Sequence, residues 1–265
     1  MITQKIGFIG CGNMGGAILK GALARGVLAP EQVWVYDVSQ AAKEDAKTLG
    51  VNVATSNAEL CANSDIILLG VKPQYTPEVL AECGKYMDGK AIMSIVAGIS
   101  VERLKNMIDG EVRILRIMPN TPAMVFEGAF ALCSDNDFTE AELAVAKSIY
   151  ENLGIVEMIP EKLFDAICGT SGGGPAWVAM FIEAMGDAGV KNGLPRATSY
   201  RLAAQTVLGT AKMYLETGKH PGELKDMVTS PGGTTIEGCE ALERGGFRYA
   251  IMDCVDKATA KSKTL

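Results

Sequence analysis

The chain has 265 residues, 48% hydrophobic and 21% charged, with a formal net charge of −6, which is enough chain for one large domain or two modest ones. The acidic balance, the lack of a long apolar run and the single histidine argue against a nucleic-acid binder, a membrane-spanning protein and a multi-histidine metal site, and we expect no metal ion. Seven dispersed cysteines without a C-x-x-C pair, and an N-terminus without signal-peptide features, predict a reduced, cytoplasmic protein.

Short apolar runs alternate with helical patterns over the first part of the chain. We expect strands at residues 5–9, 33–36, 65–71, 91–96, 113–118, 128–133 and 155–159. A helix at 14–24 follows the first strand, and a capping box formed by Thr139 and Glu142 begins another helix, which ends before Gly154. This alternation predicts βαβ units and a Rossmann-type, doubly wound parallel sheet in residues 1–160.

The strand patterns stop after Pro160, and only helices are expected beyond it. They are predicted at 175–188, 195–216 and 222–228, and from Thr234 and Phe247 onward. The segment 196–217 carries apolar or small residues over a stripe too wide for a surface helix. We therefore predict a helical domain at 161–265 whose core is completed by a second copy of the chain.

A glycine-rich fingerprint lies between the first predicted strand and the first predicted helix, with the sequence GCGNMG at 10–15. Gly10 permits a tight turn, Gly12 lets the backbone approach a pyrophosphate, and Gly15 allows close packing of helix against strand. The free N–H groups at the start of the helix would face the phosphates. In this context the motif predicts a dinucleotide site, and a plain strand–helix turn is the alternative.

Asp37 ends the second predicted strand, about 20 residues after the last glycine of the fingerprint. A carboxylate there would accept hydrogen bonds from ribose hydroxyls and disfavour a 2′-phosphate, which favours NADH. Alternatively, Asp37 caps the turn into the next helix.

The loops 71–74, 97–98 and 118–122 follow three further strands at the same edge of the sheet. We expect them at the nicotinamide end, although each also has the composition of an ordinary turn.

Two glycine clusters precede helices in the second part, TSGGGP at 170–175 and SPGGTT at 230–235. Consecutive glycines let backbone N–H groups converge on an anion such as a carboxylate, whereas the alternative is a loop with a helix cap. For the first cluster we favour a packing or hinge role. For the second both interpretations stay open, because the hydroxyls of Thr234 and Thr235 exceed what a cap requires.

The sequence resembles the pyrroline-5-carboxylate reductase family over essentially its whole length. The resemblance is carried by IGFIGCGNMGGAI at 6–18, VKPQ at 71–74, AGIS at 97–100, RIMPNTPA at 116–123, the segment 171–196 and, most specifically, GKHPGELKDMVTSPGGTTIEG at 218–238. It implies an α/β fold with a Rossmann domain at 1–160 and an all-helical dimerisation and substrate-binding domain at 161–265. It also implies homodimers, commonly assembled into decamers, and hydride transfer from NADPH or NADH to L-1-pyrroline-5-carboxylate, giving L-proline.

The resemblance further implies roles for individual residues. Backbone N–H groups of Gly233, Thr234 and Thr235 would bind the substrate carboxylate beside Ser230, and the Thr235 hydroxyl would meet the ring nitrogen as the catalytic group. Together with the motifs above, it gives the expected cofactor-binding set Gly10, Gly12, Asn13, Met14, Gly15, Asp37, Asn57, Val71, Lys72, Pro73, Ala97, Gly98, Met118, Pro119 and Asn120. The family is most often described with NADPH, so the resemblance and Asp37 point to different cofactors.

A cyclic imine suits a chain with few acid–base residues beside its glycine loops, because such a substrate is basic enough to arrive protonated. Accordingly, we expect Lys72 to help position the cofactor and His220 to be structural or to lie at the surface. A dehydrogenase of 3-hydroxy acids or a broader imine reductase is the alternative within the same class. A non-catalytic dinucleotide sensor is the alternative outside it.

Overall fold

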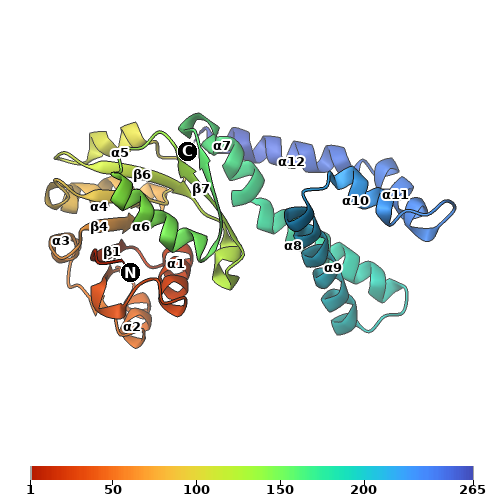
Figure 1. Ribbon diagram of the computed structural model, residues 1–265, viewed down its shortest axis with the longest axis horizontal. Coiled ribbons are helices and arrows are strands. Elements are labelled where there is room, and N and C mark those ends of the chain that lie inside the picture. Colours follow the sequence, from red (N-terminus) through yellow and green to blue (C-terminus); the bar gives the residue numbers. More distant parts are fainter. Residues whose placement is uncertain (1, 265) are drawn as a thin grey trace. The chain divides into compact units, whose positions relative to one another are not determined.

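The computed structural model describes residues 2–264 and divides into two compact units (Figure 1). Unit 1 consists of Met1–Gly173 together with Lys257–Leu265, and unit 2 consists of Gly174–Asp256. The first unit thus extends beyond residue 160, and the end of the last helix belongs to it.

Unit 1 is built on one eight-stranded sheet in the order β3-β2-β1-β4-β5-β6-β7-β8. The strands are β1 (Ile6–Ile9), β2 (Val33–Tyr36), β3 (Asn52–Val53), β4 (Ile66–Leu69), β5 (Ala91–Ser94), β6 (Arg113–Met118), β7 (Gly128–Cys133) and β8 (Gly154–Ile159). The strand order reverses between β1 and β4, which are parallel neighbours, and this is the doubly wound arrangement that the sequence predicts.

The prediction of an all-parallel sheet is wrong at one pair of strands. The strands from β3 to β6 pair in parallel, but β7 is antiparallel to β6, and β8 is parallel to β7. Only residues 119–127, which include the short turn Thr121–Val125, connect β6 to β7. A parallel pair needs a crossover of about a dozen residues or more, so this connection permits only an antiparallel return.

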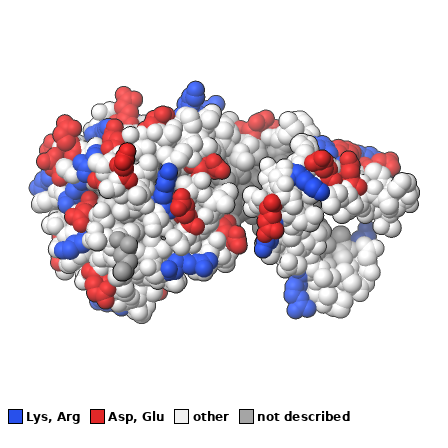
Figure 2. All heavy atoms as spheres, in the orientation of Figure 1, with Lys and Arg blue, Asp and Glu red and all other residues white. Residues whose placement is uncertain are grey.

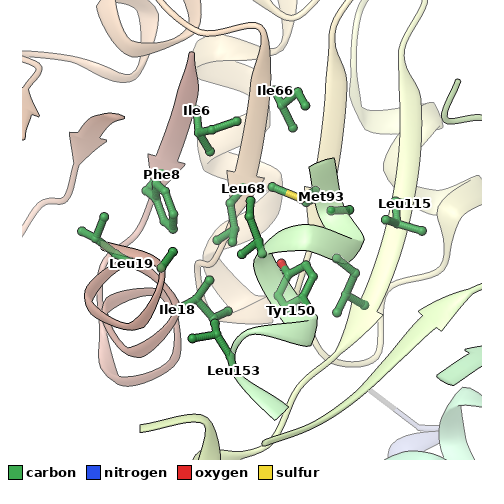
Figure 3. Packing of buried hydrophobic residues seen from close by; sticks show 14 of the residues in the cluster. Ile6, Phe8, Ile18, Leu19, Ile66, Leu68, Met93, Leu115, Tyr150 and Leu153 are labelled. Atoms are coloured by element: carbon green, nitrogen blue, oxygen red, sulfur yellow. The ribbon is translucent and has the colours of Figure 1, made fainter. Parts of the chain in front are cut away.

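Helices cover both faces of the sheet. Strand side chains alternate between the faces, so Phe8 and Leu68 belong to one core and Ile9 and Leu69 to the other. The first core includes residues of α1 (Asn13–Ala24), α2 (Gln40–Thr48) and α6 (Glu140–Glu151), and the second includes residues of α3 (Asn57–Ala62), α4 (Thr76–Cys83) and α5 (Val101–Met107). Figure 3 shows Tyr150 of α6 within the first core, between α1 and the sheet.

The predicted capping box is present at the start of α6. Thr139 Oγ1 accepts the N–H of Glu142, and the Glu142 carboxylate accepts the N–H of Thr139, at 3.3 and 2.9 Å. Glu142 also binds Arg113 of β6 at 2.7 Å. Burial raises the pKa of Glu142, but these hydrogen bonds outweigh it and lower the pKa overall. The carboxylate therefore ties the start of α6 to the sheet.

After β8 the chain is helical, as predicted. Unit 1 continues through α7 (Phe164–Ile167) and a short π-helix (Cys168–Gly172). The remaining helices are α8 (Gly174–Lys191), α9 (Arg196–Thr217), α10 (Pro221–Met227), α11 (Thr234–Arg244) and α12 (Phe247–Ser262). Within unit 2, α8 and α9 lie side by side. A Cβ on Gly186 would lie 2.8 Å from the Tyr200 ring, so glycine lets these helices approach closely.

Unit 2 leaves many large apolar side chains exposed. Met180 of α8, Leu202 and Leu215 of α9 and Met252 of α12 are each more than half exposed. In Figure 2, acidic and basic residues are interspersed over unit 1, whereas large parts of the visible surface of unit 2 carry neither. A single chain does not cover the apolar faces of these helices, and exposed faces of this extent mark interaction surfaces.

Candidate functional site

The three glycines of the fingerprint have different surroundings. Gly10 has φ +88°, and a Cβ there would lie 3.0 Å from the backbone of Gly70; a Cβ on Gly15 would lie 2.3 Å from the carbonyl oxygen of Gly10. Around Gly12, by contrast, a Cβ would meet no atom of the chain within 4 Å. Gly12 also caps α1, with no side chain bound to the free N–H groups. Packing requires Gly10 and Gly15, whereas Gly12 faces open space suited to a phosphate.

Asp37 ties the glycine loop to the end of β2. One of its carboxylate oxygens accepts the N–H of Cys11 at 2.7 Å, and the other accepts the N–H of Ser39 at 2.8 Å. The turn-capping role is therefore present. Each oxygen keeps capacity for a second hydrogen bond, so the ribose contact stays a prediction.

Burial and the nearby Asp37 charge raise the pKa of the Cys11 thiol to about 12, which keeps this thiol protonated.

The loops after β4, β5 and β6 lie at the same edge of the sheet as the glycine loop, because these strands are parallel neighbours of β1. The N–H of Gly70 binds the Ile9 carbonyl at 2.8 Å, which brings the ends of β1 and β4 together where the strand order reverses. Ligands of doubly wound proteins bind at this position. Lys72 is exposed there, and Gly98 has φ +72°. The structure thus brings the predicted cofactor-binding loops together; their contacts with a cofactor stay predictions.

Asn57 is buried at the start of α3 and only half satisfied. Its Nδ2 donates to Glu82 at 3.2 Å, but its Oδ1 has no hydrogen-bond partner in the part of the chain that the structure describes. A buried acceptor without a donor costs about 1–3 kcal/mol. A ribose hydroxyl would supply that donor. Together with the open space at Gly12, this acceptor shows that the residues fit a dinucleotide.

Both polar atoms of the Asn120 side chain bind the chain itself. Oδ1 accepts the N–H of Ala129 at 2.8 Å, and Nδ2 donates to the carbonyl of Ser171 at 3.2 Å. The Ser171 carbonyl lies in the short π-helix, a feature often found at functional sites. This makes Asn120 a brace between the loop after β6 and the first glycine cluster. The sequence indicated only a cofactor contact for Asn120, which stays a prediction.

The second glycine cluster lies in unit 2, at the start of α11. Gly233 is the capping residue of α11, no side chain caps it, and its N–H donates to the Ser230 carbonyl at 3.0 Å. Thr234 and Thr235 follow in the first turn and are exposed. The cap is therefore not a threonine, and the N–H groups of this turn remain available for an anion.

His220 is a structural residue, as predicted. Its Nδ1 accepts the N–H of Gly222 at 3.1 Å, and its own N–H donates to Glu223 at 3.1 Å, which completes a capping box at the start of α10.

Over residues 2–264 there is no group of three or more His, Cys, Asp or Glu side chains that could hold a metal ion. No helix within those residues is long and apolar enough to cross a membrane.

Two residues that the motifs did not single out form an ion pair beside the start of α5, where the loop after β5 ends. Arg116 of β6 is buried and forms an ion pair with Glu161 at 3.0 Å. The sequence signal was a charged residue inside an apolar strand, RILRIM, since buried arginines are almost always paired. The partner could not be identified from sequence because it lies far along the chain.

The fold and this edge define a class: a doubly wound dinucleotide-binding unit, followed by helices, as in nicotinamide-dependent oxidoreductases. Residues 5–98 match the family model described as "NADP oxidoreductase coenzyme F420-dependent". Residues 161–265 match the model described as "Pyrroline-5-carboxylate reductase dimerisation".

The comparisons extend over the whole chain. It is 45% identical to the pyrroline-5-carboxylate reductase of Escherichia coli over 268 residues, and 43% identical to that of Methanosarcina acetivorans over 267, covering 100% of this chain and 99% of each relative. The crystal structure of Plasmodium falciparum pyrroline carboxylate reductase with NADP bound superposes with a TM-score of 0.91 at 37% identity, covering 100% of this chain and 98% of that one.

The chain belongs to the pyrroline-5-carboxylate reductase family. It is an oxidoreductase that uses a nicotinamide cofactor, and it carries an oligomerisation region in its C-terminal helices. The family, the α/β fold class and the class of enzyme predicted from the sequence are confirmed.

Proposed function

We propose that this chain reduces the C=N bond of L-1-pyrroline-5-carboxylate, giving L-proline, with NADH or NADPH as the reductant. The observation that carries the proposal is the identity of 43–45% over the whole chain to relatives named for this reaction. Both glycine loops that the reaction would use are present, at 10–15 and 230–235. When bound, the reduced nicotinamide supplies a hydride ion.

The residues of unit 1 would hold the cofactor. The N–H groups of the glycine loop, beside Asn13 and Met14, bind the pyrophosphate, and the open space at Gly12 admits it. The free Oδ1 of Asn57 accepts a ribose hydroxyl. Three loops would bound the nicotinamide end, with contacts from Val71, Lys72, Pro73, Ala97, Gly98, Met118, Pro119 and Asn120.

The start of α11 would hold the substrate. The N–H groups of Gly233, Thr234 and Thr235 bind its carboxylate, with Ser230 alongside, and the dipole of the helix favours the negative charge. The hydroxyl of Thr235 meets the ring nitrogen. Because a cyclic imine is basic enough to arrive protonated, these residues need only hold the ring in reach of the hydride donor. The product is a secondary amine, which takes up a proton from water.

A direct assay tests this function. Purified protein is expected to oxidise NADH or NADPH in the presence of pyrroline-5-carboxylate, with proline formed in equal amount. Absence of turnover with both cofactors would refute the proposal. Binding of a cofactor without turnover would favour a non-catalytic sensor, and turnover only with 3-hydroxy acids would favour a dehydrogenase of those acids.

For the cofactor, we propose that Asp37 gives NADH the advantage. Its carboxylate is fixed by two backbone N–H groups at the place expected for the ribose. Nearby basic side chains are engaged elsewhere: Lys43 lies over the Tyr36 ring at 4.8 Å, and Lys20 pairs with Asp45 at 2.6 Å. A 2′-phosphate would therefore meet an uncompensated negative charge.

Replacing Asp37 by Ser is expected to raise the ratio of kcat/KM with NADPH to that with NADH about tenfold, equivalent to about 1.4 kcal/mol. The measurement is steady-state kinetics with both cofactors for each variant. Asp37→Asn is the matched control, because it keeps one acceptor oxygen for the loop but removes the charge, so it should shift the ratio in the same direction. An unchanged ratio in both variants would show that Asp37 does not read the ribose.

For the assembly, we propose a homodimer formed through the C-terminal helices, with decamers built from such dimers. The exposed apolar faces of α8, α9 and α12 support this proposal. Functionally, residues 1–160 are then the dinucleotide-binding domain and residues 161–265 the dimerisation and substrate-binding domain. Sedimentation equilibrium tests the proposal, because it separates the mass of two or ten chains from that of one.

We place the protein in the cytoplasm, consistent with its seven free thiols.

A further inference from the structure

We propose that Glu161 and Arg116 are positioning residues for the nicotinamide end of the cofactor. The proposal rests on the proposed function, which places the nicotinamide at the carboxyl edge of β4, β5 and β6. Its basis is a partly buried ion pair, with Arg116 buried and Glu161 half-buried, that connects the end of the loop after β5 to the strand that leads into the loop after β6.

Arg116 lies on β6, two residues before Met118. Its side chain is 8% exposed, and its Nη1 lies 3.0 Å from Glu161 Oε1. The guanidinium also lies over the Phe164 ring, 4.8 Å from its centre. Arg116 is thus held by two residues from one short segment, which directly follows β8.

The same oxygen of Glu161 holds a third segment. Glu161 Oε1 accepts the N–H of Val101, the first residue of α5, at 2.8 Å. The N–H of Glu161 in turn donates to Asp135 Oδ2 at 3.1 Å. One carboxylate oxygen therefore joins β6 to the start of α5, and the backbone of the same residue is fixed to the loop after β7.

The N–H of Val101 is where the loop after β5 ends. That loop contains Ala97 and Gly98, and Gly98 adopts φ +72°, a conformation that favours glycine. Arg103 of α5 donates from its Nη1 to the Gly98 carbonyl at 3.3 Å. A shift of the start of α5 would therefore move Gly98 with it. Glu161 sets the position of this loop relative to β6.

An ion pair with one buried partner is a poor means of adding stability, because removing the Arg116 charge from water offsets much of the attraction. What it provides is a fixed geometry, since both partners must stay in place. Here that geometry concerns two of the three loops expected around the nicotinamide. The adenosine half of the cofactor, by contrast, would meet the glycine loop, Asp37 and Asn57, none of which contacts the pair.

The chain offers a matched control on the same strand. Arg113 begins β6 and pairs with Glu142 at 2.7 Å, and Glu142 also accepts a backbone N–H, that of Thr139, at 2.9 Å. Each glutamate thus binds one arginine of β6 and one backbone N–H at the start of a helix. The two pairs differ in the end of β6 at which their arginines lie, and only Glu161 also binds the start of α5, after the loop that contains Gly98.

The experiment compares binding of NADH with binding of ADP-ribose, which lacks the nicotinamide, by titration calorimetry on the full-length protein. Glu161→Ala is expected to weaken NADH binding about tenfold and to leave ADP-ribose binding within about twofold. Glu142→Ala should leave the ratio of the two affinities at its wild-type value, whatever it does to the melting temperature. Glu161→Gln keeps an acceptor oxygen for Val101, and its ratio should lie between those of the wild type and Glu161→Ala.

The outcomes separate this inference from the function on which it rests. If Glu161→Ala weakens NADH and ADP-ribose equally, or neither, the pair is only structural and the inference is overturned. Should that variant fail to fold, an unchanged ratio in Glu161→Gln overturns it in the same way. Wild-type protein that binds NADH no more tightly than ADP-ribose would instead remove the proposed nicotinamide site itself.

Discussion

Replacing Thr235 by Ala is expected to lower kcat about 10- to 100-fold while leaving the affinity for NADH within about twofold. The hydroxyl would be lost from the ring nitrogen, where it helps hold the imine in reach of the hydride donor. Thr235 is exposed in the first turn of α11, and it is not the cap of that helix, which is Gly233. The substitution therefore removes a functional group without removing a cap.

Two neighbouring variants make this result specific. Thr234→Ala removes a hydroxyl from the same turn and should affect kcat much less, because its proposed contact is through the backbone. Thr235→Ser restores a hydroxyl and should recover most of the activity. The measurements are kcat, KM for both substrates and the melting temperature. Parallel losses of turnover, cofactor affinity and stability in Thr235→Ala would show that Thr235 supports the fold instead of the reaction.

Local patterns predict most elements of this fold, because each depends on residues close in sequence, but the two-residue strand β3 (Asn52–Val53) was not among the predicted strands. The capping box at Thr139 begins α6, and α9 ends at Gly218, which adopts φ +63° as a helix-ending glycine does. The fingerprint at 10–15 was identifiable because its glycines serve one strand–helix connection. The predicted strand 65–71 exceeds β4 by Asp65 at one end and by two residues at the other, where Val71 continues the apolar run into the loop beyond Leu69.

What the sequence left open depends on contacts between distant residues. The direction of β7 follows from the short connection after β6, which a strand pattern alone does not reveal. Asp37 was recognised as a possible ribose ligand or cap, but its bond to Cys11 required the fold. Likewise, the partner of Arg116 lies 45 residues away, and the residue braced by Asn120 lies 51 residues away. Side chains that organise the site are therefore visible only once the sheet is assembled.

Gly12 and Gly15 are both expected to lose NADH affinity when replaced by Ala, but for different reasons and with different effects on stability. At Gly12 a Cβ meets nothing within 4 Å, so Gly12→Ala should cost about 1 kcal/mol or less of stability, the difference between the two residues as helix caps. It should nevertheless weaken NADH binding at least tenfold, because the methyl group occupies the space through which the pyrophosphate approaches. Equilibrium unfolding in urea and calorimetric titration with NADH measure the two effects.

At Gly15 the same methyl group would lie 2.3 Å from the Gly10 carbonyl, within the strand–helix turn itself. Alanine is favoured over glycine inside a helix by about 1 kcal/mol, so any net destabilisation must come from this clash. We expect Gly15→Ala to lose about 1–3 kcal/mol of stability, as overpacked sites do, and to bind NADH poorly because the loop shifts. If Gly12→Ala lost as much stability as Gly15→Ala and kept its affinity, the open space at Gly12 would not be a phosphate site. Unequal stabilities with a common loss of affinity would show that one glycine admits the ligand and the other shapes the turn that receives it.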